Sequence, residues 1–522
     1  MCMGQPSFLR AAYGAGVVLR LLSVLSMAMV HPDEYFQCPE VMAKSIFNIP
    51  HAFIPWEYKD PPPNRSVFFP SLVAGLPYAL WKALGLNANG LAFLLLPRLV
   101  LLALSFTYDY TIVAICRRFH VDATGPLFAL STSWTTWVFL TRPFSNTCES
   151  FLLLLTFLAL FQLPATTRRT ALLGLVLACG TFTRFTFILF FFPAGLYLVW
   201  DNDRHLMRAA SKKATDGGRT SSVSQRLVGV AHTAAVGAVS FAATAFAIVL
   251  LDTRFFQGSL APPFVVAPWN NFIYNMDPSH LADHGLHPHT NHWLVNMPLL
   301  FGPLVPCLLV AAASRAPRPV HLVCLASIAF PVSLLSLAPH QEARFLLPVA
   351  LPLFLATGAT LVSHRALQLV WLVFNIALGL WFGVLHQGGL VSFLLASSGS
   401  VAHHPLCASS SLSPIMDNVH AIVITGTYMP PRFALSPRHL PLDDVPLARL
   451  HATLETHRGN SVLLAFPDPL AHDVDAIVAA MDGVRRVPAM TCWPFLSTES
   501  FPTNVANTST WTLHVEHLSW ST

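Results

Sequence analysis

The sequence predicts an all-α polytopic membrane protein that ends in a small α/β domain. Hydrophobic residues make up 54% of the 522 residues and charged residues only 11%, less than half of the roughly 25% usual in soluble domains. Long apolar runs recur between residues 11 and 386, whereas residues 393–522 are polar and hold no membrane-length run. This composition excludes soluble, fibrous and disordered proteins, and the scattered basic residues exclude a nucleic-acid-binding protein.

Apolar runs along the chain predict eleven membrane-crossing helices, since each approaches the ~20 residues that such a helix needs. They cover residues 11–30, 91–116, 122–140, 148–163, 170–183, 185–200, 227–251, 294–312, 319–338, 345–362 and 367–386. Arg184 lies near the middle of the apolar stretch 170–200, so we expect a tight hairpin at Thr183-Arg184; one long tilted helix is the alternative. Residues 70–86 are expected to form a lumenal or half-inserted amphipathic helix.

Basic residues between the runs predict how the chain is oriented. With a cytosolic N-terminus, every short inside connection is basic, and the inside loop 201–226 carries six Lys and Arg residues. This is the positive-inside pattern, and it places the loop 31–90, the C-terminal part and the glycosylation sequons at Asn64 and Asn507 outside. A cleaved signal peptide is the alternative for the first run, but its only cleavage candidate is Ser26-Met27-Ala28, so we expect a retained helix.

The domain boundary is expected after residue 392, with a membrane domain over 1–392 and a C-terminal lumenal domain over 393–522. In the second part, short apolar runs alternate with loops and a helical piece at 473–482, which indicates an α/β fold. None of the nine Cys residues has a C-x-x-C or zinc-ligand spacing. We expect free or buried thiols, with a lumenal disulfide such as Cys407–Cys492 as the alternative.

The densest polar cluster, His31 to Glu40, directly follows the first apolar run. Adjacent carboxylates at Asp33 and Glu34 are unfavourable at the membrane surface unless they are used; a helix cap is the alternative reading. Other short polar stretches fall on the same predicted face. They contain Trp56, Glu57 and Arg65 in the first loop, Arg142 in the next one, and His340, Glu342 and Arg344 in a later one. An enzyme site built from several loops is the simplest account of all of them.

Carboxylates with nearby Arg and His residues suit transfer from a phosphate-linked donor to a hydroxyl group. A carboxylate takes the hydroxyl proton, and basic groups stabilise the leaving phosphate. The sequence has no P-loop, G-x-G-x-x-G or H-E-x-x-H motif. D-x-D patterns occur at Asp201–Asp203 and Asp473–Asp475, but a three-residue pattern is expected by chance in a chain of this length. The lack of a convincing D-x-D on the outer loops favours a lipid-phosphate donor over a nucleotide sugar.

The heptapeptide His31-Pro-Asp-Glu-Tyr-Phe-Gln37 resembles the H-P-D-E-x-F-Q signature of the dolichyl-phosphate-mannose-dependent α-mannosyltransferases, glycosyltransferase family 22. Trp56-Glu57-Tyr58, Arg65-Ser66, the stretch 340–348 and Tyr428-Met-Pro-Pro-Arg432 also look like family motifs. The resemblance implies a GT-C fold in the endoplasmic reticulum membrane with a lumenal active site. It implies dolichyl-phosphate-mannose as donor, a GPI precursor or lipid-linked oligosaccharide as acceptor, membrane lipids as partners, and no cofactor.

Two further stretches resemble the branch of this family that adds a fourth, α1,2-linked mannose to the GPI precursor. Residues 37–43 are similar to its Q-S-P-E-V-M-A, and residues 282–288 are similar to its A-E-H-G-L-H-P, with Cys38 and Asp283 as departures. The alternatives are the third-mannose enzyme and the members that act on lipid-linked oligosaccharide. The acceptor is expected to contact the lumenal loop 252–293, through its aromatic residues and His284 and His287.

By position in the motifs, Asp33 is expected to be the general base, and Glu34 a second base or an acceptor contact. A β-linked donor and an α-linked product imply inversion by a single displacement. Arg142, Arg344 or His340 is expected to hold the leaving phosphate, with Arg184 a weaker candidate. The expected substrate-binding residues are His31, Gln37, Trp56, Glu57, Arg65, Arg142, His284, His287, His340, Glu342 and Arg344.

No metal site is expected, because the spacing of His287, His289 and His292 does not place all three on one helix face. A lipid or sugar transporter is the other function class. Transporters usually carry charges near the bilayer midplane and show internal repeats. Here the charges gather at one face, and no repeat is visible, which favours an enzyme; a non-catalytic subunit is a third possibility.

Overall fold

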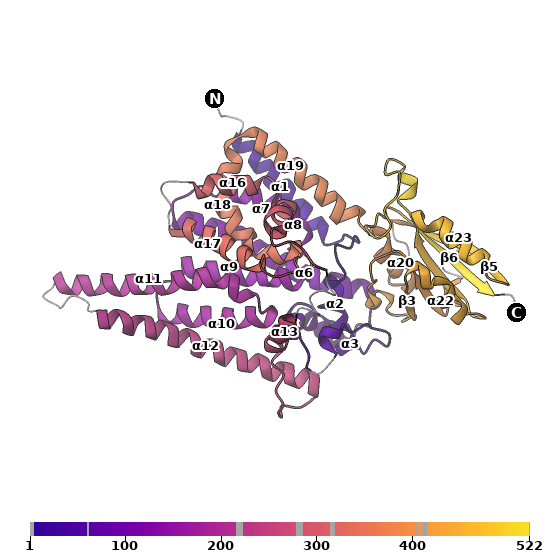
Figure 1. Ribbon diagram of the computed structural model, residues 1–522, viewed down its shortest axis with the longest axis horizontal. Coiled ribbons are helices and arrows are strands. Elements are labelled where there is room, and N and C mark those ends of the chain that lie inside the picture. Colours follow the sequence, from indigo (N-terminus) through magenta and orange to yellow (C-terminus); the bar gives the residue numbers. More distant parts are fainter. Residues whose placement is uncertain are drawn as a thin grey trace.

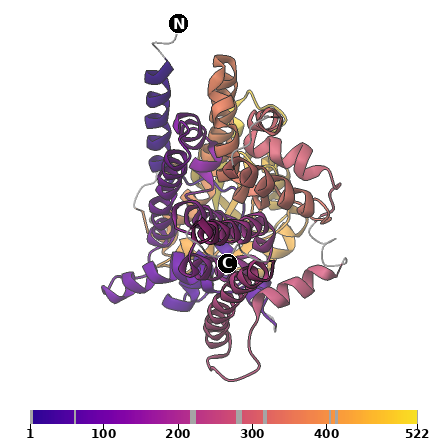
Figure 2. The ribbon, with the colours of Figure 1, turned by 90° about the vertical axis from the view of Figure 1, so that its left-hand side faces the viewer.

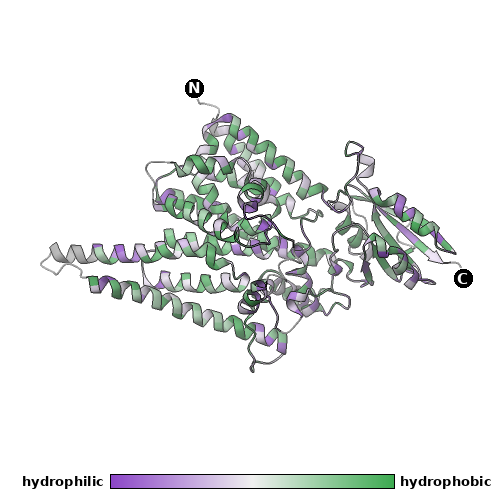
Figure 3. Cartoon of the chain, in the orientation of Figure 1, coloured by the Kyte–Doolittle hydropathy of each residue, from purple (hydrophilic) through white to green (hydrophobic). Residues whose placement is uncertain are grey.

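The computed structural model describes residues 5–59, 62–215, 223–277, 285–313, 319–401, 405–409 and 415–520. A helical bundle forms most of the molecule, and a β-sheet lies at one end of its longest axis (Figure 1). At the opposite end, a hairpin of α11 (Phe187–Thr215) and α12 (Val223–Gln257) extends from the bundle. Hydrophobic residues dominate the bundle helices (Figure 3).

The apolar runs all contain helices in the described residues, but the expected count of eleven spans is not confirmed. Five helices are long and apolar enough to cross a membrane, or six if one pair bent by 113° counts as a span. The five cover Gly90–Arg118 (α6), Ser145–Gln162 (α9), α12, Ala343–Ser363 (η4 with α18, Ala350–Ser363) and Arg365–Leu385 (α19, Arg365–Leu380, with η5). The bent pair joins His292–Phe301 to α16 (Leu304–Ala312).

Residues 122–140 do not form the single long helix that the sequence predicts. They form two short helices, α7 (Thr124–Ser131) and α8 (Trp134–Val138), rather than one. Both lie in the interior, and α7 packs against α18 through Gly125 and Gly358, where an added Cβ would collide with the facing backbone. Close packing of small residues is typical of helices inside membranes. An apolar sequence here reflects burial within the protein.

The predicted break at Thr183-Arg184 is confirmed. Helix α10 (Thr167–Thr183) ends there, and α11 begins at Phe187. The Arg184 backbone N–H donates to Gly180 O at 2.8 Å and closes the last turn of α10. Helices α10, α11 and α12 then lie side by side (Figure 1).

Helix α1 (Gln5–Ser23) stands at the edge of the bundle (Figure 2). A buried ion pair fixes it to α6, because Arg20 Nη1 lies 2.7 Å from Asp109 Oδ2. The Tyr13 hydroxyl donates to Asp109 Oδ1 at 2.7 Å. Paired and hydrogen-bonded charges are the form in which ionisable groups are tolerated inside a membrane. Helix α1 is therefore part of the folded bundle.

The first loop folds into short elements on the side of the bundle that faces the sheet. They are α2 (Asp33–Phe36), α3 (Pro39–Phe47), η1 (Trp56–Tyr58), α4 (Phe68–Pro70), η2 (Ser71–Gly75) and α5 (Leu76–Ala83). The segment 70–86 is amphipathic, as predicted. Leu72, Leu76 and Leu80 are exposed at intervals of four residues, while Val73 and Tyr78 are buried. An exposed apolar stripe of this kind suits a helix lying in a membrane surface.

The C-terminal part is a six-stranded sheet with the order β1-β5-β6-β4-β2-β3. Its strands are β1 (Cys407–Ser409), β2 (Ala421–Ile424), β3 (Leu442–Asp444), β4 (Val462–Pro467), β5 (Val484–Cys492) and β6 (Leu513–Trp520). Strand β2 pairs in parallel with β3 and β4, and the other pairs are antiparallel.

Both faces of the sheet are covered. Val462 and Leu464 pack with α22 (Leu450–Thr456) and α23 (Ala471–Ala479), whereas Leu463 and Ala465 join the core shared with the bundle. Because β4 is buried on both faces, it is apolar along its whole length. The expected boundary after residue 392 falls inside α20 (Gly388–Ser398), a buried helix that packs on β1 and β5.

A disulfide joins Cys407 in β1 to Cys492 in β5. The expectation of free thiols is wrong for this pair. The antiparallel register of β1 and β5 places the two residues opposite each other, although they lie 85 positions apart in the sequence. The other cysteines that the structure describes are free and buried: Cys38, Cys116, Cys148, Cys179, Cys307 and Cys324.

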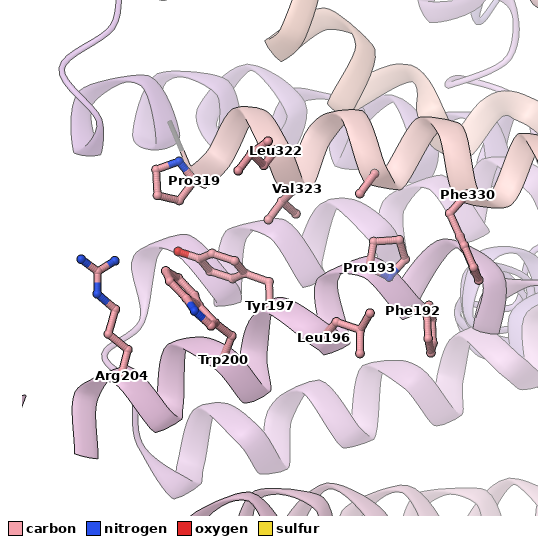
Figure 4. A pocket seen from close by; sticks show the side chains of 11 residues that line it. Phe192, Pro193, Leu196, Tyr197, Trp200, Arg204, Pro319, Leu322, Val323 and Phe330 are labelled. Carbon is pink, nitrogen blue, oxygen red and sulfur yellow. The ribbon is translucent and has the colours of Figure 1, made fainter. Parts of the chain in front are cut away.

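A groove of about 580 Å³ lies between α11 and α17 (Pro319–Leu335), and its lining is almost entirely apolar (Figure 4). At one end, the rings of Phe192 and Phe330 stack with centroids 4.8 Å apart. At the other, the Arg204 guanidinium lies 5.1 Å from the centroid of the Trp200 ring. The groove contains none of the residues predicted for the functional site.

Candidate functional site

Asp33 lies in the first turn of α2, and 26% of its side chain is exposed. Two donors hold one of its carboxylate oxygens: Gln37 Nε2 lies 2.6 Å and Arg344 Nη1 2.7 Å from Oδ2. Gln37 reaches it because residues four apart share a helix face. The predicted residues Gln37 and Arg344 thus both contact Asp33 directly.

The second oxygen of Asp33 is the more open one. Within the described residues, only His31 Nδ1 approaches Oδ1, at 3.5 Å. That nitrogen faces two N–H donors, the Asp33 backbone at 3.2 Å and Arg344 Nη1 at 3.1 Å. We therefore assign the ring proton to Nε2. Oδ1 is the oxygen that an incoming hydroxyl can reach.

Electrostatics keep Asp33 ionised. Burial raises the pKa of its carboxyl group, but the positive charges beside it, above all that of Arg344, outweigh burial, and the net pKa is below the usual value. Burial, with Arg344 next in importance, lowers the pKa of His31. At neutral pH the site therefore presents a carboxylate beside a neutral imidazole.

A row of alternating charges runs from Asp33 into the loop before η4 (Ala343–Val349). Arg344 Nε lies 2.5 Å from Glu342 Oε2, and His340 Nε2 lies 3.0 Å from Glu342 Oε1. His287 joins this group, because its Nδ1 accepts from the Gln341 N–H at 3.3 Å. The structure thus brings His287, His340, Glu342 and Arg344 together with Asp33, as the sequence analysis predicts.

Ser145, at the start of α9, connects several polar groups behind Asp33. Its hydroxyl donates to Gln37 Oε1 at 3.0 Å and lies 3.4 Å from Arg65 Nη1 and 3.3 Å from Arg184 Nη1. Arg65 also pairs with Glu57 at 2.9 Å. The sequence analysis selects Arg142 from this outer loop and misses Ser145. A lone serine carries no spacing signal that could reveal this role.

Glu34 points away from Asp33 into the protein interior, with none of its side chain exposed. Arg98 Nε and Nη2 lie 2.9 and 2.5 Å from Glu34 Oε1, and Arg142 Nη1 lies 2.9 Å from Oε2. Arg142 is 1% exposed and also donates to Ala28 O at 2.5 Å. Both groups are committed to one buried cluster, Arg98–Glu34–Arg142, rather than open to a substrate.

The remaining predicted residues lie at the edge of the site or outside the described ranges. Trp56 is 40% exposed, and its ring centroid lies 4.6 Å from that of Tyr274 in α13 (Ala267–Met276). The first loop and the stretch 252–293 thus each contribute one aromatic ring to this contact. His284 lies outside the described residues.

Residues 12–409 match the family model described as the Alg9-like mannosyltransferase family. The chain belongs to the Alg9-like mannosyltransferase family. It is 35% identical over 485 residues to GPI alpha-1,2-mannosyltransferase 4 of Homo sapiens, covering 83% of this chain and 76% of that protein. It is 32% identical over 452 residues to GPI mannosyltransferase 4 of Aspergillus oryzae, covering 82% of this chain and 78% of that one.

Among solved structures, the chain is similar to ArnT from Cupriavidus metallidurans bound to undecaprenyl phosphate. The TM-score is 0.46 and the identity 11%, over 99% of this chain and 98% of that one.

As a member of this mannosyltransferase family, the protein is an enzyme, and its D-x-D pattern at 201–203 has another role. Asp201 Oδ2 lies 2.8 Å from Arg169 Nη2, and Asp203 Oδ2 lies 2.7 Å from Arg226 Nη2. These ion pairs connect α11 to α10 and α12 far from Asp33. The carboxylates are used in packing the helix ends.

The alkaline side of the pH profile of this mannosyltransferase is expected to depend on His340. Burial lowers the pKa of His340, but the hydrogen bond and charge of Glu342 raise it further, so the net pKa is above the ordinary 6.5. The protonated ring donates to both of its neighbours, Glu342 and Gly285 O. Since protonation adds positive charge beside Arg344, kcat/KM for the donor should fall as pH rises through that raised pKa.

Measurement of kcat/KM against pH for His340→Gln tests this prediction. The variant should be less active and should lose the alkaline limb. His289→Gln is the matched control, because His289 lies nearby and contacts only Ser336 O among the hydrogen bonds of the described residues. An unchanged alkaline limb in His340→Gln would contradict the assignment.

Proposed function

We propose that this family member transfers the fourth mannose of the GPI anchor, in α1,2 linkage, from dolichyl-phosphate-mannose to the third mannose of the precursor. Relatives named GPI mannosyltransferase 4 match more than four fifths of the chain. The observation that carries the chemistry is Asp33, a partly exposed carboxylate with one oxygen fixed by Gln37 and Arg344 and the other open.

In the proposed reaction, the acceptor hydroxyl attacks C1 of the donor mannose as its proton passes to Asp33 Oδ1. The new C–O bond forms while the bond between C1 and the phosphate oxygen breaks, and dolichyl phosphate leaves with the electron pair. One displacement inverts the anomeric centre, so no covalent intermediate on the protein is required. Gln37 and Arg344 keep Asp33 oriented through its other oxygen, which is the role of a positioned general base.

Arg344 is the proposed contact for the leaving phosphate, with the charge of His340 behind it. Its side chain is 9% exposed, and its guanidinium group pairs with the carboxylates of Asp33 and Glu342. An arginine fork suits phosphate oxygens. Arg184 is the second proposed contact, because it lies beside Ser145 and its Cζ is 4.8 Å from the Phe345 ring centroid. Arg142, buried with Glu34, is left out of this step.

The proposed transfer needs no metal or organic cofactor. No three His, Cys, Asp or Glu side chains gather as metal ligands within the ranges that the structure describes. The clustered histidines have protein partners instead: His289 faces Ser336 O at 2.9 Å, and His292 faces Asn296 at 3.0 Å. The proposed ligands are the donor lipid and the GPI precursor.

We place the site on the lumenal side of the endoplasmic reticulum membrane. The disulfide between Cys407 and Cys492 supports this placement, because disulfides persist in oxidising compartments. The C-terminal sheet that carries it lies beside the first loop, opposite the hairpin of α11 and α12 (Figure 1). The basic residues of the segment 201–226, which runs from the outer part of α11 to the start of α12, suit the cytosolic side.

Glycosylation tags are expected to report this orientation. A tag inserted after Ser259, in the exposed turn that follows α12, should be glycosylated in microsomes. A tag inserted within residues 216–222 should remain unmodified, because the N-glycosylation enzyme acts only on the lumenal side. Endoglycosidase-sensitive mobility on gels measures both. The reverse pattern would contradict the orientation and the use of a lumenal donor.

Loss of the protein is expected to cause accumulation of a GPI precursor with three mannoses. Mass analysis of GPI lipids from cells lacking the chain tests this, with re-expression of the intact chain as control. Accumulation of a two-mannose precursor would instead assign the third-mannose reaction. A truncated lipid-linked oligosaccharide would move the protein to the N-glycan branch of its family.

A further inference from the structure

Tyr428 comes from the C-terminal domain, yet its side chain lies beside the catalytic loop. Its ring centroid is 6.3 Å from that of His31, which is only two residues from Asp33. The ring is half-buried and also meets His386, with centroids 5.2 Å apart. Its hydroxyl lies 3.2 Å from Thr498 Oγ1, on a second segment of the same domain. The proposed mechanism assigns no role to Tyr428, Thr498 or His386.

A buried polar residue holds Tyr428 at its backbone. Gln387, with none of its surface exposed, accepts from the Tyr428 N–H at 2.9 Å and donates to Ser497 Oγ at 3.2 Å. Gln387 has a positive φ of 51°, which is strained for a residue with a side chain. Beside it, the His386 backbone accepts from the Met29 N–H at 3.0 Å. His386 and Gln387 thus connect the chain before His31 to the two C-terminal segments that contain Tyr428 and Ser497.

A second buried group fixes the other end of the Tyr428 segment. Glu40, in α3, is fully buried, and its carboxylate accepts from the backbone N–H groups of Phe53 at 3.0 Å and Phe433 at 3.1 Å. Burial of a carboxylate is unfavourable without such partners. Pro430 and Pro431 stiffen the four residues between Tyr428 and Phe433. Tyr428 is therefore held rigidly against the catalytic loop from both sides.

From this geometry we propose that Tyr428, with Thr498 and the Nε2–H of His31, forms a sugar-binding subsite for a mannose of the acceptor glycan. The acceptor must bring a hydroxyl to Asp33 Oδ1, so its adjoining sugar residues lie within reach of His31 and Tyr428. A tyrosine offers an apolar ring face for the C–H face of a hexose and a hydroxyl for its edge. Pre-positioned rings bind without loss of side-chain entropy. The C-terminal domain thereby takes part in acceptor recognition.

This inference rests on the proposed function, and one set of assays separates the two. Purified protein is given labelled dolichyl-phosphate-mannose and a trimannosyl GPI acceptor, and KM is measured for each. Transfer by the unmodified protein tests the proposed function alone. If only a dimannosyl GPI acceptor is used, that function fails, and the variants are then measured with the dimannosyl acceptor.

Tyr428→Leu should raise the acceptor KM about tenfold, the loss expected for one aromatic contact, and leave the donor KM unchanged. Tyr428→Phe keeps the ring and should change the acceptor KM by no more than about threefold. Trp493→Leu is the matched control: Trp493 is an aromatic residue in the same C-terminal part of the chain, is 50% exposed, and should leave both KM values unchanged. An unchanged acceptor KM in Tyr428→Leu overturns the proposal, as does an equal rise in both KM values with a lower melting temperature, which would indicate a purely structural role.

Discussion

Replacing Asp33 with Asn is expected to lower the rate of mannose transfer by ~10²–10⁴-fold, the usual contribution of a positioned general base. The substitution preserves size and leaves an amide oxygen for Gln37 and Arg344, which now hold the carboxylate at 2.6 and 2.7 Å. It removes the carboxylate that is proposed to take the acceptor proton. Acceptor and donor should still bind, so the loss should appear in kcat. Transfer of labelled mannose by microsomes or purified protein measures it.

Protein level and melting temperature should be close to those of the unmodified protein, because Asp33 is partly exposed. Asp417→Asn is the matched control. Asp417 lies in the C-terminal part of the chain and is 81% exposed, so this variant should transfer mannose at an unchanged rate. Full activity in Asp33→Asn would move the base to another residue. Loss of the protein together with its activity would instead favour a helix-capping role for Asp33.

The sequence singles out the heptapeptide 31–37 that contains the proposed base, but it does not separate the roles of Asp33 and Glu34. Successive helical residues point about 100° apart, so Asp33 and Glu34 must face different surroundings. Which of them faces inward depends on Arg98 and Arg142, which lie 64 and 108 positions further along the chain. No local pattern encodes that pairing. Topology nevertheless predicts that His340, Glu342 and Arg344 approach Asp33, because positive-inside counting places their loop on the same face.

The contacts between the C-terminal part of the chain and the first loop lie beyond sequence patterns for the same reason. Tyr428 meets His31, and Phe433 meets Glu40 across 393 positions, through contacts that only the folded chain defines. The Cys407–Cys492 pair depends on the register of β1 and β5. The prediction of the number of helices fails for a different reason. Hydropathy cannot distinguish a helix exposed to lipid from one buried in protein, as α7 and α8 show.

The Arg98–Glu34–Arg142 cluster stabilises the exit of the chain from α1 and thereby the orientation of Asp33. Arg98 Nη1 donates to Ser26 O at 2.5 Å and to Val24 O at 3.2 Å, while Arg142 contacts Ala28 O. All three side chains are at most 1% exposed. Glu34 supplies the only negative charge in this cluster. The backbone carbonyls partly neutralise the two guanidinium groups, but they carry no net charge.

Replacing Glu34 with Gln is therefore expected to destabilise the fold by roughly 3–5 kcal/mol, the usual result of removing one partner from a buried ion pair. Two buried arginines would remain without a counter-ion, so protein level and melting temperature in detergent should both fall. Glu499→Gln, at an exposed position of the C-terminal domain, should change neither. Comparison of the melting temperatures of the two variants is decisive. Asp33→Asn should be stable but inactive, whereas Glu34→Gln should have a lower melting temperature. A Glu34→Gln protein with a normal melting temperature and no transfer would place Glu34 in the chemistry and contradict its structural role.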